Sequence, residues 1–299
     1  MTTEASQPSL ELDRNLLSEL KRIELRTRRS LNTDLMGSYR SAFRGTGLSF
    51  SELREYQPGD DVRHIHWKVT ARSNKTFVKT FDEDRQLSIF LGVDISRSME
   101  FGYPKTRYRK AVEFAAVLTT LARSSGDLVG LSLFSSEVES FYPPRGSRNQ
   151  IHLTIAELLR ARTLPERTDL SASLAHIRRH LRKTSIVFII SDFLDDNFEL
   201  ELRGLSHAHD VILVNLGTPQ LDDLPNVGLV EYQDAETGER RTINTSNSRL
   251  RTRYQEVEKS RIERLESLAR STKADLIHIQ DNILEPLSTL MKRRVQRVR

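Results

Sequence analysis

Leu87-Ser-Ile-Phe-Leu-Gly-Val-Asp94 is an apolar run that ends in a carboxylate, and Ile-Ser96-Arg-Ser98 follows it directly. The run has the length of a buried strand, and a helical pattern begins a few residues later. In open α/β sheets, ligands bind at the carboxyl edge of the strands, where Asp94, Ser96 and Ser98 are expected to lie. One carboxylate and two hydroxyls spaced two residues apart supply hard oxygen donors, which suit Mg²⁺ or Mn²⁺. The alternative is that these residues only cap a helix or close a turn.

Two later residues favour the metal interpretation. Thr168 stands immediately before a helical pattern, and Asp192 ends the apolar run that starts at Ser185. Capping of the following helix explains either residue alone. We interpret each polar position as lying on a loop after a strand, at one edge of the sheet, which capping does not explain. The sequence therefore predicts one oxygen-only metal site made by Asp94, Ser96, Ser98, Thr168 and Asp192.

Composition limits the class of protein. The 299 residues are 37% hydrophobic and 29% charged, which is typical of a globular chain with two domains or one large α/β domain. The sequence contains no cysteine, which excludes disulfides and thiolate metal sites and fits a reducing compartment. The N-terminus is polar and acidic, unlike a signal peptide, and the apolar runs are too short to span a membrane. We therefore expect a cytoplasmic protein without a membrane span.

The net charge is +5, and the chain has basic runs at residues 26–29 and 292–299. Such runs can bind nucleic acid or an acidic membrane surface, but they also suit a solvated helix end. Aromatic residues make up only 7% of the chain and do not alternate with the basic runs, so stacking on bases is poorly supported. We expect a solvated basic end and disfavour nucleic-acid binding.

The chain divides into two predicted parts. Residues 1–85 are expected to form an N-terminal helix, over about 10–31, and a small β-rich subdomain packed beside the main domain. Its short strands are expected at 48–50, 62–70 and 76–81, and on the second of these Ile65, Trp67 and Val69 would share one face.

Residues 86–299 alternate between strand-like and helix-like patterns. Strands are expected at 87–94, 127–135, 138–142 (as a hairpin), 185–191, 210–216 and 274–280. Helices are expected at 105–123, 149–162, after Thr168, before 210, at 248–271 and after Pro286, and residues 227–244 are expected to form an exposed hairpin. This alternation predicts an α/β fold with a doubly wound, mainly parallel sheet covered by helices on both faces.

The order D-x-S-x-S, then Thr, then strand-terminal Asp resembles the von Willebrand factor A domain and its metal-ion-dependent adhesion site. The resemblance implies a von Willebrand A-like domain over residues 86–299 and Mg²⁺ (or Mn²⁺/Ca²⁺) as the bound ion. It also implies that Ser96, Ser98 and often Thr168 contact the metal, while Asp94 and Asp192 act partly through water. Because hydroxyls are neutral, such a site under-neutralises a divalent ion and favours an Asp or Glu from a protein partner.

Residues 47–72 carry a second resemblance, in the run Gly47-Leu-Ser-Phe-Ser-Glu-Leu-Arg-Glu-Tyr-Gln-Pro-Gly59-Asp-Asp-Val-Arg63-His-Ile-His-Trp67-Lys-Val-Thr-Ala-Arg72. It resembles the bacterial domain of unknown function 58 family, whose members pair such a segment with a von Willebrand A-like domain. The resemblance implies an adaptor or chaperone-like role beside a MoxR-type AAA+ ATPase or its client.

Within that segment, Arg54, Arg63, Trp67 and Arg72 have no assigned role. The arginines form a partner-binding or anion-binding face, or they pair with Glu52, Asp60 and Asp61, which is the simpler account. A zinc site at His64 and His66 is disfavoured because no third and fourth ligand is evident.

Two other function classes stay open. A Mg²⁺- or Mn²⁺-dependent phosphoesterase would need a general base, for which Asp169 and Asp195 are candidates, although both also fit as helix caps or turn residues. The sequence has no G-x-S-x-G elbow and no Walker A motif. A basic nucleic-acid-binding protein is the third class. We expect a metal-dependent protein-interaction module and not an enzyme.

Overall fold

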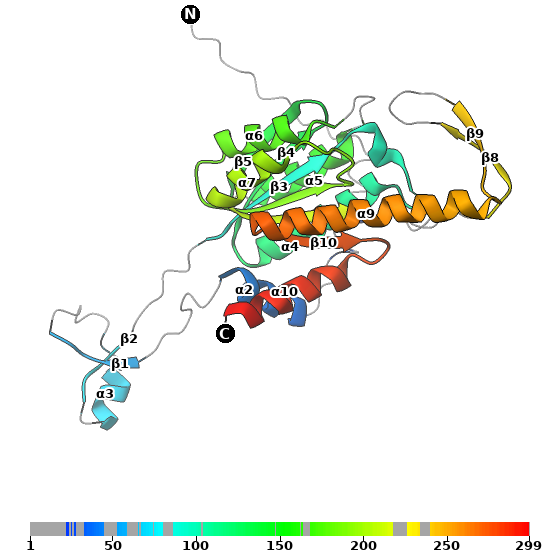
Figure 1. Ribbon diagram of the computed structural model, residues 1–299. Coiled ribbons are helices and arrows are strands. Elements are labelled where there is room, and N and C mark those ends of the chain that lie inside the picture. Colours follow the sequence, from blue (N-terminus) through cyan, green and yellow to red (C-terminus); the bar gives the residue numbers. More distant parts are fainter. Residues whose placement is uncertain are drawn as a thin grey trace, which may run out of the picture.

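The computed structural model shows a layered α/β domain, a small unit formed by β1, β2 and α3 from the N-terminal part of the sequence, and a hairpin beyond the end of a long helix (Figure 1). It describes residues 22–23, 25, 27, 33–44, 53–58, 65, 67–73, 75–79, 86–102, 104–146, 148–161, 163, 168–217, 226–233 and 240–298.

A six-stranded sheet forms the centre of the domain, in the order β10-β7-β6-β3-β4-β5. All neighbouring strands are parallel except β5, which returns antiparallel beside β4. The doubly wound, mainly parallel sheet predicted from the sequence is therefore confirmed, including the hairpin after the second strand. The strands are β3 (Ser88–Asp94), β4 (Leu128–Phe134), β5 (Val138–Arg145), β6 (Ile186–Ser191), β7 (Asp210–Leu216) and β10 (Asp275–Ile279).

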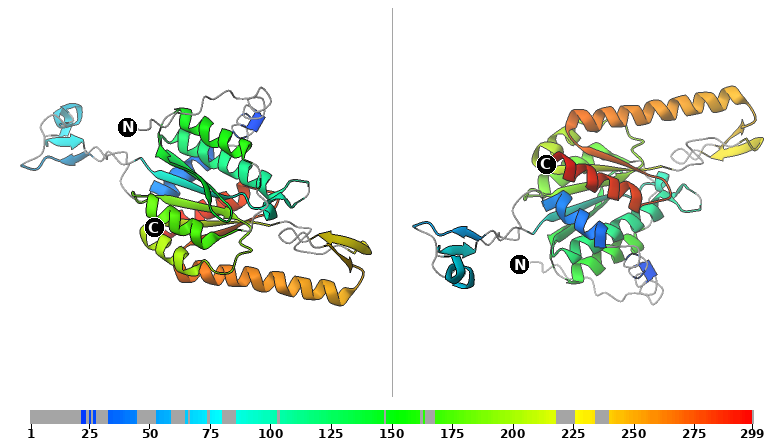
Figure 2. Two further views of the ribbon diagram at one scale, coloured as in Figure 1. Left: turned by 90° about the horizontal axis from the view of Figure 1, so that it is seen from above. Right: turned by 90° about the horizontal axis from the view of Figure 1, so that it is seen from below.

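Helices cover both faces of this sheet (Figure 2). Among the described residues, the first apolar cluster joins one face of the sheet to one group of helices, and the second cluster joins the other face to another group. The first group is α2 (Thr33–Arg44), α4 (Arg107–Ser124), α5 (Arg148–Arg160) and α10 (Leu284–Val298). The second group is α6 (Leu170–His180), α7 (Glu199–Ala208) and α9 (Ser248–Thr272).

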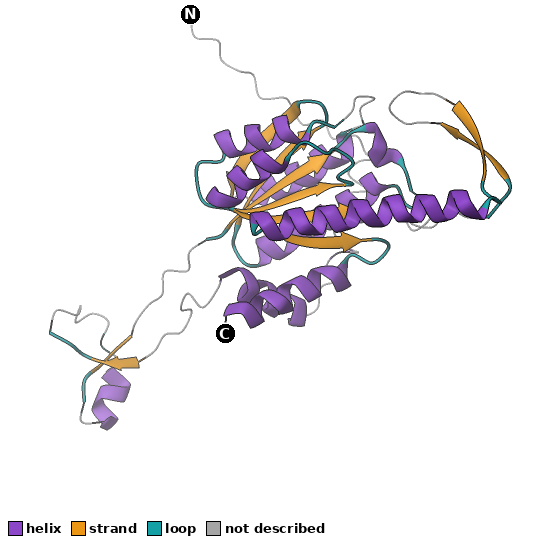
Figure 3. Ribbon diagram, in the orientation of Figure 1, coloured by secondary structure: helices purple, strands orange, loops and turns teal. Residues whose placement is uncertain are grey.

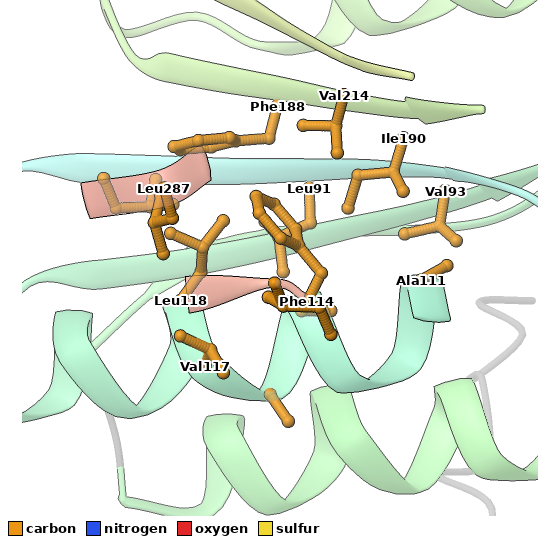
Figure 4. Packing of buried hydrophobic residues seen from close by; sticks show 14 of the residues in the cluster. Leu91, Val93, Ala111, Phe114, Val117, Leu118, Phe188, Ile190, Val214 and Leu287 are labelled. Atoms are coloured by element: carbon orange, nitrogen blue, oxygen red, sulfur yellow. The ribbon is translucent and has the colours of Figure 1, made fainter. Parts of the chain in front are cut away.

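The strand β3 supplies both apolar clusters, because successive side chains of a strand point to opposite faces. Leu91 and Val93 belong to the cluster that contains α4, whereas Phe90 belongs to the opposite one. On the α4 side, Phe114 and Leu118 recur at helical spacing and pack against the sheet (Figure 4). Burying each such side chain stabilises the fold by about 1.5–3 kcal/mol, which fixes the end of β3 in place.

The helix α2 lies mostly within residues 35–85, which were expected to be β-rich, and that expectation is wrong for residues 35–44. Leu35, Tyr39 and Phe43 are four residues apart, so they share one helical face, and all three are buried in the first cluster. Phe43 also lies under the guanidinium of Arg294 from α10, 5.1 Å from the ring centroid. The helix therefore packs against α10.

The small N-terminal unit consists of β1 (Leu53–Glu55) and β2 (Phe77–Lys79), which pair antiparallel, and α3 (Trp67–Ser73) (Figure 3). The strand predicted over residues 62–70 is wrong from Trp67 onward. Ile65 and Val69 are four residues apart, a spacing that fits one face of a helix as well as one face of a strand. The helix α3 is joined to β2 by a hydrogen bond from the Phe77 N–H to Thr70 Oγ1 at 3.1 Å. Residues 10–21, 48–50 and 62–64 of the other predicted elements lie outside the described residues, as do the Arg63, His64 and His66 positions.

The basic C-terminal run was expected to be solvated, and this is wrong for Arg294, which is only 9% exposed. Its Nη1 and Nη2 donate to Asp210 at 2.6 and 2.7 Å, and its Nε donates to Asp275 at 2.7 Å. Arg294 therefore ties α10 to the beginnings of β7 and β10.

The predicted exposed hairpin is confirmed as β8 (Leu229–Gln233) and β9 (Arg240–Asn244), which pair antiparallel. It lies beyond the N-terminal end of α9 (Figure 1). Among the described helices, none combines the length and apolar character needed to cross a membrane.

Candidate metal site at the carboxyl edge of the sheet

The candidate site lies where the direction of strand addition reverses. From β3 the chain adds β4 and β5 on one side, and then β6, β7 and β10 on the other. Such a reversal opens a crevice at the carboxyl ends of the two strands that flank it. Asp94 is the last residue of β3, and Asp192 directly follows β6. The fold therefore places two of the predicted residues at this reversal point.

Asp94 lies at the centre of a hydrogen-bonded group and is fully buried. Its Oδ1 accepts the backbone N–H of Ser96 at 2.8 Å, and its Oδ2 accepts the hydroxyls of Ser191 at 2.6 Å and Thr168 at 3.1 Å. Burial, together with the negative charge of Asp192, raises the pKa of Asp94 to about 6, although the hydrogen bonds from Ser191 and Ser96 oppose the rise. Keeping this carboxylate ionised at neutral pH is thus costly without a cation.

Ser96 and Ser98 lie next to each other, with their hydroxyl oxygens 3.1 Å apart. Both are buried, and Ser96 precedes the short 3₁₀ helix η2 (Arg97–Glu100). Adjacent ligands of an octahedral Mg²⁺ ion, each about 2.1 Å from the metal, are roughly 3 Å apart. The two hydroxyls therefore have the separation of neighbouring ligands on one ion.

Thr168 reaches the site from the loop between α5 and α6, so the expectation that it follows a strand is wrong. The loop is attached to the end of β4, where the Asp169 N–H donates to the Ser135 carbonyl at 2.9 Å. Thr168 does not cap α6 either, because Asp169 is the N-cap and accepts the Ala172 N–H at 2.7 Å. The Thr168 hydroxyl is therefore available to donate to the Asp94 carboxylate.

Asp192 does not cap the following helix, since the N-cap of α7 is Phe198. Its carboxylate instead faces a buried arginine: Arg107 Nη1 donates to Asp192 Oδ2 at 2.6 Å and to the Ser98 carbonyl at 3.2 Å. The Arg107 and Asp192 side chains are only 7% and 2% exposed. The sequence interpretation missed Arg107, which stands at the start of α4 like an ordinary helix residue.

The loop after β6 is fixed by two further contacts. Phe193 has a left-handed backbone, with φ of 52°, and its N–H donates to Ser191 Oγ at 3.1 Å. Arg261 of α9 donates from Nη1 to the Asp192 carbonyl at 2.8 Å. Ser191 was also missed by the sequence interpretation, although its place at the end of β6 beside Asp192 was a usable signal.

The two candidate bases hold helix α6 in place. Asp169 caps it, and Asp195 accepts the Leu170 N–H through Oδ2 at 2.9 Å and the Asn197 N–H through Oδ1 at 3.3 Å. Both carboxylates thus have the capping and turn roles that were the simpler interpretation.

Apolar side chains are exposed beside this edge. Phe101, which follows η2, is 37% exposed, and Leu194, two residues after Asp192, is 49% exposed. Exposed apolar residues around a polar centre are typical of protein-binding surfaces when they form a patch.

The donor set suits a hard divalent cation. Asp94, Ser96, Ser98 and Thr168 are joined by direct hydrogen bonds, and Asp192 is joined to the Ser98 carbonyl through Arg107. All five side chains offer oxygen, the ligand that Mg²⁺ and Mn²⁺ prefer. That a metal binds there stays a prediction.

Comparison with known proteins identifies relatives over most of the chain. The family model described as protein of unknown function DUF58 matches residues 52–264. An uncharacterized protein of Mycobacterium tuberculosis is 34% identical over 233 residues, which cover 76% of this chain and 73% of that protein.

The solved structures that match this chain are more distant in sequence. BatB from Bacteroides thetaiotaomicron is 15% identical, with a TM-score of 0.47, over 70% of this chain and 99% of that one. A von Willebrand factor type A structure from Catenulispora acidiphila is 11% identical, with a TM-score of 0.39, over 75% of this chain and 43% of that one. The family match and the mycobacterial relative each cover most of this chain, so the chain belongs to the DUF58 family.

Proposed function

We propose that this chain is a metal-dependent protein-interaction module that binds Mg²⁺ or Mn²⁺ through Asp94, Ser96, Ser98, Thr168 and Asp192. A carboxylate from a protein partner completes the coordination shell. The observation that carries the proposal is the set of hydrogen bonds that gathers Asp94, Ser96, Ser98 and Thr168 at the carboxyl edge of the sheet.

The charges of the site favour a ligand from outside the chain. Asp94 and Asp192 are the two carboxylates, and Arg107 already pairs with one of them. The three hydroxyls are neutral, so a divalent ion bound here keeps an excess of positive charge. An Asp or Glu side chain of a partner removes that excess, which makes the ion a bridge between two proteins.

Binding fits the residues better than hydrolysis does. Metal-dependent hydrolysis needs a general base within hydrogen-bond reach of an activated water. The nearby carboxylates of Asp169 and Asp195 are occupied by backbone N–H groups of α6 and of the loop before α7. The exposed Phe101 and Leu194 beside the site also suit a protein surface.

We further propose a MoxR-type AAA+ ATPase, or the client that it remodels, as the partner. This part rests on family resemblance, whereas the partner's carboxylate rests on the charge of the site. The two parts are tested separately.

The first experiment compares the proteins retained by immobilised wild type, Asp94→Ala and Asp196→Ala, each in Mg²⁺, in EDTA and after Mg²⁺ is restored. Asp196 is an exposed carboxylate near the site and serves as the matched control. The proposal predicts a partner that is retained by wild type and Asp196→Ala in Mg²⁺, is lost in EDTA and is not retained by Asp94→Ala. The proposal is contradicted if the partner is retained equally in Mg²⁺ and in EDTA, and equally by wild type and Asp94→Ala.

Once a partner is identified, each acidic residue at its contact surface is replaced by Asn or Gln. Replacing the bridging acid should weaken binding as much as EDTA does, with no further loss when both are applied, whereas additive losses contradict the bridge. A change in the turnover or hexamer assembly of a MoxR-type ATPase, when this protein is added with Mg²⁺, supports the ATPase. Steady Mn²⁺-dependent hydrolysis of p-nitrophenyl phosphate, lost in Asp94→Ala, would support the phosphoesterase alternative.

A further inference from the structure

Arg107 places a fixed positive charge inside the candidate metal site. Its side chain is 7% exposed, and Nη1 is shared between the Asp192 carboxylate and the Ser98 carbonyl. Nε of Arg107 is also buried, without a hydrogen-bond partner among the described residues. A buried guanidinium with an unpaired donor is costly unless its charge has a partner, and Asp192 is that partner.

The position of Arg107 is set by the fold and not by a flexible side chain alone. Arg107 is the first residue of α4, after Thr106, which caps the helix by accepting the Arg109 N–H at 3.1 Å. The Arg107 N–H donates to the Phe101 carbonyl at 2.7 Å, which ties the start of α4 to the loop that carries Ser98. The guanidinium is therefore held beside the serine loop and the end of β6 together.

We propose that Arg107 acts as an internal cation that competes with the metal for the Asp192 carboxylate and sets the metal affinity of the site. The inference rests on the proposed function, since it concerns the same ion. With Arg107 in place, Asp94 is the one carboxylate of the proposed set that is not paired with an arginine of the described part of the chain, so a divalent ion binds weakly by itself. Metal and partner then bind together, because the partner's carboxylate supplies the charge that Arg107 has taken from the site.

Arg261 provides a matched comparison within the same loop. It also approaches Asp192, but its Nη1 donates to the backbone carbonyl at 2.8 Å. Its charge is paired with Glu258, whose Oε2 accepts from Arg261 Nε at 2.9 Å. Removing Arg261 therefore removes a nearby arginine without freeing the Asp192 carboxylate.

The test measures Mn²⁺ affinity by electron paramagnetic resonance and calorimetry, with no partner present. Arg107→Gln keeps an amide donor and loses the charge, so its dissociation constant for Mn²⁺ should fall by about tenfold or more. Arg107→Lys and Arg261→Gln should each stay within about threefold of wild type. If Arg107 had a purely structural role, the dissociation constant for Mn²⁺ would rise in Arg107→Gln, because a damaged site binds the ion more weakly.

Circular dichroism and thermal unfolding establish that each variant is folded, and Arg107→Met is a second uncharged variant in case Arg107→Gln fails to fold. Equal or weaker Mn²⁺ binding by a folded uncharged variant overturns the inference and leaves the metal site in place. If neither wild type nor the variants bind Mn²⁺ at millimolar concentration, the metal site itself is wrong. If the uncharged variant binds Mn²⁺ more tightly but partner retention is the same in EDTA as in Mg²⁺, the competition between Arg107 and the metal stands, whereas the coupled binding of metal and partner and the proposed function both fail.

Discussion

Ser191, at the end of β6, donates its hydroxyl to Oδ2 of Asp94, at the end of β3, over 2.6 Å. The two residues are 97 positions apart in the chain, and both are completely buried. This hydrogen bond joins the strands on either side of the reversal point and stabilises the charged form of Asp94. It does not offset the cost of burial, because the pKa of Asp94 still rises to about 6.

The raised pKa predicts how metal-free stability depends on pH. Asp94 binds its proton more tightly in the folded protein than in the unfolded chain. Its contribution to the free energy of unfolding is therefore most favourable at low pH and is lost as the pH rises through about 6. Above that pH, the buried charge costs on the order of 3 kcal/mol. In EDTA at pH 7.5, we expect Asp94→Asn to raise the free energy of unfolding by about 1–3 kcal/mol, and we expect the gain to shrink toward pH 5.

Urea unfolding of wild type, Asp94→Asn and Asp196→Asn at both pH values measures this effect. Asp196 is exposed, so its replacement should change the free energy of unfolding by less than about 0.5 kcal/mol. A loss of stability in Asp94→Asn at pH 7.5 would mean that the hydrogen bonds of the carboxylate outweigh its desolvation.

Loss of the two serine hydroxyls should separate metal binding from folding. The Ser96 and Ser98 hydroxyls bond to each other, so the double variant Ser96→Ala, Ser98→Ala removes both partners and should cost about 1 kcal/mol or less. Because two of the proposed ligands disappear, Mn²⁺ binding should fall below detection. Ser173→Ala is the control: its hydroxyl donates to the Asp169 carbonyl at 2.8 Å in α6, so a similar loss of stability should leave Mn²⁺ binding unchanged. Global unfolding of the double variant would assign the serines a structural role instead.

Gly130 allows β5 to approach β4, and its replacement should be disruptive. A Cβ atom there would lie 2.8 Å from both the Pro144 nitrogen and the Tyr142 carbonyl oxygen, which are backbone atoms that cannot turn aside. We expect Gly130→Ala to lower the free energy of unfolding by about 3 kcal/mol. Gly37→Ala should instead raise it by roughly 0.5–1 kcal/mol, since Gly37 lies within α2 with open space around it. Relative to wild type, the midpoint of thermal unfolding should fall in Gly130→Ala and rise in Gly37→Ala.

Arg294 should be essential for the position of α10. Among the described residues, Arg294→Gln leaves Asp275, whose side chain is 8% exposed, with the more exposed Arg293 and Arg297 as its ion-pair partners. A loss of about 3 kcal/mol is expected from breaking this largely buried ion pair. Lys292→Gln removes one positive charge from an exposed position of the same helix and should be nearly neutral. If urea unfolding shows that the two variants are equally stable, the ion pairs of Arg294 contribute little to the free energy of unfolding.

The sheet and the five candidate ligands could be predicted from the sequence because their signals are local. An apolar run that ends in Asp94 or Asp192 marks both a buried strand and its carboxyl end, whatever else the chain does. Alternation of strands and helices then determines a parallel sheet, and parallel strands bring their polar ends to one edge. Thr168 was predicted from its place in the pattern that resembles the von Willebrand A domain, although the structure shows that a helix and not a strand precedes its loop.

Only the tertiary structure decided which residues surround those candidate ligands. Arg107 and Ser191 stand in ordinary positions at a helix start and a strand end, and they become part of the site through partners 85 and 97 residues away. Whether Arg107 is solvated or buried against the Asp192 carboxylate depends on how the start of α4 lies relative to the end of β6. No local sequence pattern encodes the distance between those two elements. For the same reason α3 was misjudged: the four-residue spacing of Ile65 and Val69 fits one face of a helix or of a strand, so the local pattern does not choose between them. The segment that forms α2 was assigned to a β-rich unit, although the face shared by Leu35, Tyr39 and Phe43 is helical and packs on α10 in the tertiary structure.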